Sequence, residues 1–212
     1  MIRIHDLEQE HISFQIYTLS KEDSIILTCD PPNNQLLIIL DGLVKLSKIF
    51  TNEEIVCMGI LKRDYILHYS VLRADTNNHY YKALALSETL ILSIQFTEII
   101  NKVYQKNNLL KQLILSYSYS TKGYKNMIKI LSHRQIKNRI IQLILILCEE
   151  LGQVDAKSII VPLYLSHNIV SIITGSHRIT VARIMKQLQN KKLISYNRKG
   201  LIIHDIIRLS RY

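Results

Sequence analysis

Residues 165–188 read LSHNIVSIITGSHRITVARIMKQL, and this stretch decides the fold. It contains two short apolar patterns of helical period on either side of Gly175, a residue that readily takes the positive φ of a tight turn. Ser171 supplies a small side chain where two helices would cross, and Val181 and Ile184 are placed to lock the second helix onto the first. This spacing predicts a helix-turn-helix.

The second helix of this motif has a polar face outside its apolar stripe. Arg178 lies in its first turn and Arg183 more than one turn later, so we predict that both read guanine edges in a major groove. A lone arginine on a helix is more often simply solvated, so the prediction rests on the whole pattern. We expect Ser166 and Ser176 to cap the two helices. Further candidate DNA-binding residues, mainly for positioning on phosphates, are Ser166, His167, Ser176, His177, Thr180 and Lys186.

The positive charge of the chain is concentrated around this motif. The formal charge is +10, and residues 152–212 supply +8 of it, with ten Lys or Arg against Asp155 and Asp205. Such an excess attracts a polyanion, most often nucleic acid, although a basic surface kept for solubility is the alternative. After the motif, two strand-like runs flank a turn with Arg198 and Lys199, which we predict to be a DNA-binding wing along the phosphate backbone.

Residues 1–97 carry a different pattern. From about residue 24 to 96, short β-rich runs such as QLLIIL and LVKLSKIF alternate with turn residues, including the Asp41-Gly42 pair. Strands at this spacing indicate an antiparallel all-β unit, a barrel or a roll.

Residues 98–131 carry a helical pattern in which apolar side chains recur as a heptad seam. Asn107 and Thr121 are polar seam positions, and Gly123 lowers the helix propensity nearby. We interpret the segment as a long dimerisation helix, with packing onto its own β-unit as the alternative. The predicted dimer-interface residues are Val103, Leu110, Ile114, Tyr117, Tyr124 and Ile128.

A second helix is expected from about residue 134 to 151, with Ser132 as its cap and Gly152 as its stop. The sequence thus predicts an α+β chain with three parts: a β-roll at 1–97, a dimerisation helix at 98–131 and a winged helix-turn-helix domain at 132–212.

Several classes of protein are excluded. Apolar runs such as LILILC fall short of the roughly 18 residues that span a bilayer, so we expect a soluble protein with no membrane partner. Cys29, Cys57 and Cys148 are too far apart for a metal or disulfide pattern. The histidines and carboxylates form no catalytic triad or metal-ligand spacing, so we predict no enzyme and no metal site.

Taken together, a β-roll, a long dimer helix and a C-terminal winged helix-turn-helix resemble the Crp/Fnr transcription regulators, whose roll is of the cyclic-nucleotide-binding type. The resemblance covers almost the whole chain. It is sharpest with the global nitrogen-control regulators of cyanobacteria and their plastid-encoded relatives. The matching stretches are ILDGLVKLSKIF, ILSHRQIKNRIIQLILILCEELG and the helix-turn-helix with its sequel NKKLIS and IIRLSR.

The resemblance implies a homodimer that binds double-stranded DNA at a palindromic promoter site and contacts RNA polymerase, with activation and repression both open. It implies half-sites of the GTA...TAC type, a role in nitrogen control, and 2-oxoglutarate as the one possible small-molecule effector. Arg178, Thr180 and Arg183 match the DNA-reading positions of the family.

The sensing half departs from the family pattern. LHYSVLRADTNNHYYKAL lacks the Gly-Glu and Arg-Ser cassette that holds cyclic AMP, so a cyclic nucleotide is not expected. The nitrogen-control subgroup uses an arginine of the roll, and an arginine and a glutamate of the dimer helix, where this chain has His79, Ser120 and Lys125. Its glycine beside the effector has become His68. Arg73, Lys82 and Lys122 could rebuild an anion site with His79.

An isoleucine-rich, AT-type composition and the cyanobacterial resemblance favour a protein of the plastid stroma, with bacterial cytoplasm as the alternative. The alternative function is a basic nucleic-acid-binding or interaction module without effector control.

Overall fold

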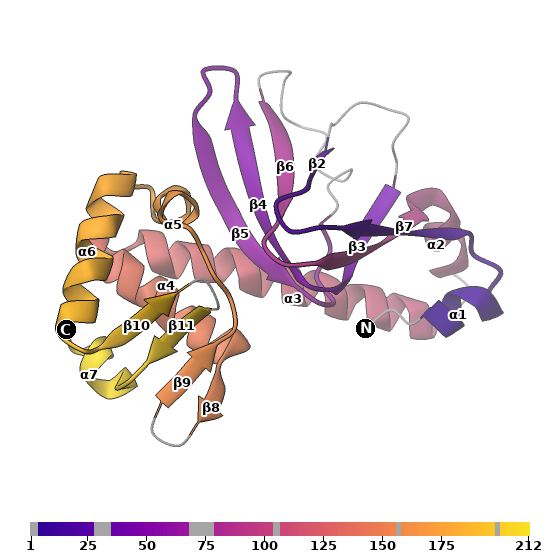
Figure 1. Cartoon of the computed structure of the whole chain (residues 1–212). Coiled ribbons are helices and arrows are strands. Elements are labelled where there is room, and N and C mark those ends of the chain that lie inside the picture. The colour runs from indigo at the N-terminus through magenta and orange to yellow at the C-terminus, as the bar shows by residue number, and fades with distance from the viewer. Residues whose placement is uncertain (1–3, 28–34, 68–78, 104–106, 156–157, 198–199) are drawn as a thin grey trace. The chain divides into compact units, whose positions relative to one another are not determined.

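The structure is a computed structural model that describes residues 4–27, 35–67, 79–103, 107–155, 158–197 and 200–212. The chain divides into two compact units, Met1–Lys125 and Asn126–Tyr212. The boundary falls inside the long helix α3 (Asn107–Leu131), whereas the domain limits expected from the sequence lie at residues 97 and 131 (Figure 1).

The N-terminal unit is built on two antiparallel sheets, which confirms the predicted β-roll. The three-stranded sheet has the order β1-β7-β3 and the four-stranded sheet the order β2-β6-β4-β5. The strands are β1 (Phe14–Leu19), β2 (Ser24–Leu27), β3 (Gln35–Asp41), β4 (Leu43–Phe50), β5 (Ile55–Lys62), β6 (His79–Ala85) and β7 (Thr89–Gln95). Helix α1 (Ile4–Gln9) precedes them, and α2 (Phe96–Val103) and α3 follow.

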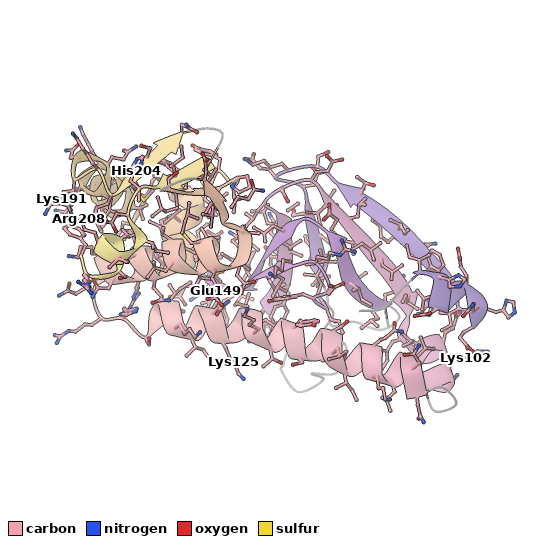
Figure 2. All side chains as sticks on the ribbon, turned by 90° about the horizontal axis from the view of Figure 1, so that it is seen from below. Lys102, Lys125, Glu149, Lys191, His204 and Arg208 are labelled. Carbon is pink, nitrogen blue, oxygen red and sulfur yellow. The ribbon has the colours of Figure 1, made fainter. Side chains whose placement is uncertain are left out.

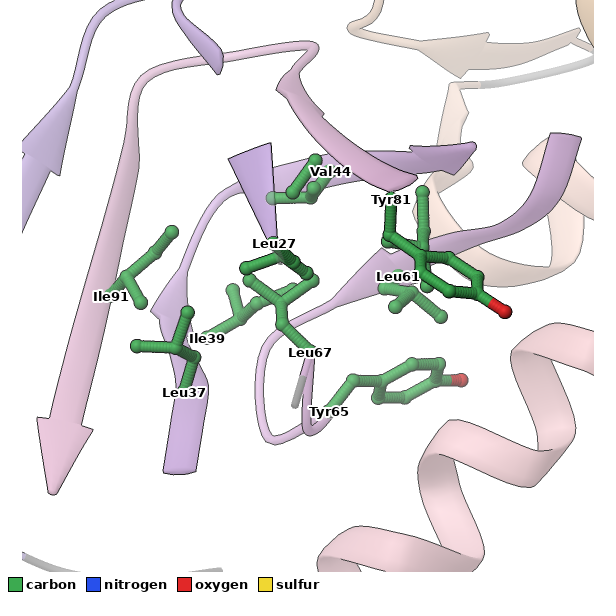
Figure 3. Close-up of a cluster of buried hydrophobic side chains, with 11 residues drawn as sticks. Leu27, Leu37, Ile39, Val44, Leu61, Tyr65, Leu67, Tyr81 and Ile91 are labelled. Carbon is green, nitrogen blue, oxygen red and sulfur yellow. The ribbon is translucent and has the colours of Figure 1, made fainter. Parts of the chain in front are cut away.

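Strand β3 is buried on both faces because it separates two apolar clusters. The interior cluster of the roll, drawn in Figure 3, contains Leu27, Leu37, Ile39, Val44, Leu46, Leu61, Tyr65, Leu67, Tyr81, Ala83 and Ile91. On the other face, Leu36 and Ile38 join residues of β7 and of all three helices, such as Leu7, Ile99 and Leu109. The continuous apolar run QLLIIL is the consequence, since a strand covered on both sides has no polar alternation.

Helix α3 approaches β5 so closely that both elements carry glycine at the contact. A Cβ on Gly123 would lie 2.7 Å from Leu61 Cδ2 and 3.1 Å from Tyr65 Cε2, and one on Gly59 would lie 3.4 Å from Tyr124 Cδ1. One turn earlier, Ser120 Oγ accepts a hydrogen bond from the Ile66 N–H (2.7 Å). Small side chains therefore allow the helix to lie directly on the roll.

A neighbouring side of α3 carries the heptad seam predicted from the sequence. Its described apolar members Leu110, Ile114, Tyr117 and Ile128 are exposed, with Ile114 at 58% and Ile128 at 68%. Tyr124 differs, because it is half-buried and packs against the interior cluster of the roll. The helical pattern also falls into two helices, α2 and α3, and the side chain of Val103 lies outside the described residues.

The C-terminal unit is a small α+β domain with the predicted helix-turn-helix and hairpin. Its helices are α4 (Ile136–Leu151), α5 (His167–Thr174), α6 (Arg178–Asn190) and α7 (Ile206–Ser210). Its antiparallel sheet has the order β10-β11-β9-β8, from β8 (Gln153–Asp155), β9 (Ser158–Val161), β10 (Ile194–Asn197) and β11 (Gly200–Ile203).

The predicted cap of α4 is wrong and the predicted stop is confirmed. Gln135 is the N-cap of α4 and makes no side-chain cap bond, while the Ser132 hydroxyl donates to the Lys129 carbonyl (2.9 Å) at the end of α3. Gly152 ends the helix with its N–H on the Cys148 carbonyl (2.9 Å), where a Cβ would lie 2.3 Å from that oxygen.

Among the described residues, no helix is both long and apolar enough to cross a membrane. Cys57 and Cys148 are buried, whereas Cys29 lies outside the described residues. Burial raises the pKa of both thiols to about 11, so they stay protonated and poorly nucleophilic at neutral pH.

We expect Gly123→Ala to destabilise the protein by about 1–2 kcal/mol. Alanine raises helix propensity by about 1 kcal/mol, but its Cβ would crowd a packed core at Leu61 and Tyr65, and overpacking costs more. Urea unfolding measures the difference. Ser118→Ala, on the exposed side of α3, is the control and should be neutral or slightly stabilising. A Gly123→Ala protein more stable than wild type would contradict the close approach.

Candidate nucleic-acid interface

The turn of the helix-turn-helix is built as the sequence predicts. Ser166 caps α5, because its hydroxyl accepts a hydrogen bond from the Ile169 N–H (3.3 Å). Gly175 follows α5 with φ +58°, in the left-handed region, and its N–H points to the carbonyls of Ile172 and Ser171. The left-handed conformation therefore favours glycine at this turn.

The predicted cap at Ser176 is wrong. Helix α6 has His177 as its N-cap, and His177 makes no side-chain cap bond. The Ser176 hydroxyl is used elsewhere, in a hydrogen bond with Thr174 Oγ1 (2.8 Å) inside the turn. Ser176 therefore supports the turn between the helices, and α6 begins one residue later than expected.

Helix α6 has one buried side and one basic side. Val181, Ile184, Met185 and Leu188 are buried in the domain core. Arg178, Arg183 and Lys186 are exposed, Thr180 is half-buried, and His177 is exposed at the start of the helix. The helix contains no Asp or Glu, so all the charges on its exposed side are positive.

A stack of aromatic rings links the first helix of the motif to the hairpin. The His167 ring stacks on Tyr196 (centroids 5.8 Å apart, planes at 18°), and Tyr196 stacks on Tyr164 (5.4 Å, 24°). Burial, with the nearby Tyr164 hydroxyl, raises the pKa of Tyr196 well above its ordinary value. His167 at the start of α5 therefore lies against β10. The predicted wing residues Arg198 and Lys199 lie outside the described residues.

Sequence reasoning missed Ile179, whose side chain is 83% exposed in the first turn of α6 between Arg178 and Thr180. An aliphatic side chain in that position has no core to enter. A signal was present, because Ile179 falls outside the phase of the stripe formed by Val181, Ile184 and Leu188.

The residues predicted to bind an effector come from strand β6 and helix α3 where they are described. β6 alternates, so His79 shares a face with Tyr81 while Lys82 lies on the other face. His79 Nε2 is buried without a hydrogen-bond partner among the described residues.

The other described effector candidates lie on α3. The Ser120 hydroxyl is hydrogen-bonded to the Ile66 backbone, and Lys125 is exposed (Figure 2). His68 and Arg73 lie outside the described residues.

Comparison with known proteins agrees with this geometry. The family described as the Crp-like helix-turn-helix domain matches residues 138–212. Over 203 residues, the chain is 30% identical to the HTH-type transcriptional regulator ycf28 of Porphyra purpurea, covering 96% of this chain and 84% of the relative. The chain belongs to the Crp/Fnr family of transcription regulators.

Other members of the Crp/Fnr family show the same kinship at lower identity. The global nitrogen regulator of a Nostoc species is 27% identical over 92% of this chain and 88% of its own length. The global nitrogen regulator of Synechococcus elongatus is 25% identical over 97% and 93%.

Solved structures share the fold of this chain. CooA of Carboxydothermus hydrogenoformans, in a mutant form, has a TM-score of 0.74 at 15% identity, covering 97% of this chain and 89% of its own. A CRP-family transcriptional regulator of Thermus thermophilus has a TM-score of 0.72 at 16% identity, over 92% and 95%. The family regulates transcription, which agrees with the prediction that the chain is not an enzyme.

Gly175→Ala should destabilise the C-terminal unit by about 1–2 kcal/mol, because an L side chain is strained at φ +58°. Crowding is not the cause, since the nearest atom to the new Cβ is Arg139 Nη1 at 3.5 Å. Gly175→Asn is the matched variant and should lose less, because asparagine tolerates the left-handed region. Urea or thermal unfolding gives the order, and equal losses for the two variants would contradict a conformational cause.

Proposed function

We propose that this Crp/Fnr regulator acts as a homodimer on palindromic promoter DNA, with one α6 in the major groove of each half-site. The observation that carries the proposal is the cationic outer face of α6, opposite a stripe that locks the helix into the domain. A helix held by its apolar side and free on its basic side is suited to lie in a groove lined by phosphates.

Residue roles follow from position on that face. Arg178 and Arg183 are the base readers, because a guanidinium can donate two bonds to guanine O6 and N7. Ile179 adds an apolar contact for a thymine methyl group. The remaining candidates position the protein on the backbone: Ser166, His167, Ser176, His177, Thr180, Lys186, Arg198 and Lys199.

The proposal of a dimer rests on the exposed apolar side chains of α3. Its roll side is filled by Gly123 and the neighbouring core, whereas Leu110, Ile114, Tyr117 and Ile128 present apolar surface on the other side. Exposed apolar side chains along one stripe of a helix of 25 residues suit a second copy of the same helix.

Regulation of nitrogen metabolism is proposed from the relatives named as global nitrogen regulators. The corresponding half-site is GTA...TAC and the corresponding signal is 2-oxoglutarate. RNA polymerase is the proposed partner at the promoter. The organisms of the relatives support work in a plastid stroma, with the bacterial cytoplasm as the alternative compartment.

The test is binding of the full chain to a duplex with a GTA...TAC palindrome and to a scrambled duplex, at one near-physiological salt concentration, with and without 2-oxoglutarate. We expect a palindrome preference of at least about a thousandfold, the lower end for specific DNA-binding proteins. A preference that rises with 2-oxoglutarate supports an effector site, and one that does not change supports a regulator without this signal. A ratio near one contradicts specific reading and favours the basic-module alternative.

In that assay, Arg183→Ala should remove about 1–3 kcal/mol of discrimination at one base pair of each half-site. Lys199→Ala is the matched loss of one cation and should weaken both duplexes alike, with a shallower dependence on salt. If the two variants act identically, Arg183 does not read bases.

Ile114→Glu should convert the homodimer to monomer and lower the affinity for the palindrome, because a buried carboxylate would face its own copy across the seam. Leu115→Glu is the control: Leu115 is also an exposed aliphatic residue, but it lies beside the seam. Sedimentation equilibrium measures the difference. A dimer that survives Ile114→Glu, or is lost equally with Leu115→Glu, would rule out this interface.

A further inference from the structure

Arg139 in the first turn of α4 is bonded to two different parts of the C-terminal unit. Its Nε donates to the His133 carbonyl (2.8 Å), and its Nη1 donates to the Thr174 carbonyl (3.0 Å). His133 lies in the linker between α3 and α4, and Thr174 is the last residue of α5. One half-buried side chain thus spans from the end of α3 to the helix-turn-helix.

Both acceptors stand at the C-terminal end of a helix. The His133 N–H donates back to Ile130 (3.4 Å), so the linker continues the last turn of α3, and Thr174 is completely buried at the end of α5. The last carbonyls of a helix have no partner within it and carry the negative end of its dipole. A guanidinium satisfies both ends with charge-assisted bonds in fixed directions, which a lysine ammonium cannot do from one point.

The bond between Arg139 and the Thr174 carbonyl lies directly beside the turn that leads into α6. A Cβ on Gly175 would lie 3.5 Å from Arg139 Nη1 and 4.0 Å from Leu131 Cδ2, so the end of α3 and the guanidinium both border this turn. α6 begins three residues after Gly175. The direction of α6 relative to the last turns of α3 therefore depends on where Arg139 holds the Thr174 carbonyl.

We propose that Arg139 is a positioning residue that sets the angle between the end of α3 and the helix-turn-helix, and thereby the half-site spacing that the dimer accepts. The inference rests on the proposed function. In a dimer joined along α3, the angle in each subunit fixes the distance between the two α6 helices, and hence the spacing between half-sites. Arg139 itself makes no base contact in this scheme, so its loss should relax spacing without relaxing base choice.

The experiment compares wild type with Arg139→Gln, Arg139→Lys and the control Arg134→Gln. Arg134 is exposed in the same linker, and its substitution removes the same charge. Affinities are measured for GTA...TAC palindromes whose spacer is optimal, one base pair shorter or one longer, and for an optimal palindrome with one half-site scrambled. Thermal unfolding of each variant is recorded in parallel.

Wild type and Arg134→Gln should prefer the optimal spacer by about tenfold or more, the scale of one lost base contact. Arg139→Gln should reduce that preference to about threefold or less while still rejecting the scrambled half-site. Arg139→Lys keeps the charge but can hold only one carbonyl firmly, so it should give an intermediate profile, and it decides the matter if Arg139→Gln does not fold.

The results distinguish the proposed function from the positioning role of Arg139. A wild-type protein that cannot distinguish palindrome from scrambled duplex overturns the proposed function, and this inference with it. A wild-type spacing preference that persists unchanged in a folded Arg139→Gln or Arg139→Lys protein overturns the inference alone. Equal losses of spacing and base selectivity in these variants also overturn it, because they would indicate general damage to the domain.

Discussion

The close approach of α3 to β5 is the contact on which the rest of the molecule depends. Gly123 and Gly59 remove the side chains that would hold helix and strand apart, and Ser120 ties the same helix to the Ile66 backbone. One side of α3 packs on the roll, whereas Leu110, Ile114 and Tyr117 stay exposed. The same helix ends at Leu131, next to the turn at Gly175 that precedes α6. Helix α3 thus contributes residues to both compact units of the chain.

Much of this could be predicted because the relevant signals are local. The β-rich runs, the heptad seam and the spacing around Gly175 each follow from side-chain period or backbone freedom, and the described strands and turn agree with them. Strand β1 was missed because most of its residues are exposed, which leaves no alternation in FQIYTL to detect. The caps at Ser132 and Ser176 failed for another reason: each hydroxyl found a nearer acceptor or hydroxyl partner than the helix start.

The DNA-binding face could be predicted from the sequence, whereas the effector site could not. The basic face of α6 follows from helical period alone, because core and surface positions alternate predictably along one helix. The effector residues come from separate elements, and their meeting depends on strand register and on which face each side chain takes. His79 and Lys82 are three residues apart on β6 and so lie on opposite faces of the strand. Arg139 could not be identified from sequence either, because its two acceptors are backbone carbonyls with no side-chain signature.

The double burial of β3 has an evolutionary consequence. Leu36, Leu37, Ile38 and Ile39 are each at most 7% exposed, and successive residues face different clusters. A lineage can exchange these residues only among aliphatic side chains of similar volume, since a polar or smaller side chain would damage one cluster or the other. By contrast, the exposed surface of β1 can vary with little effect on the fold. Among relatives that share a third of their residues or fewer, β3 should therefore be a more dependable marker of common descent than the strand two places away in its sheet.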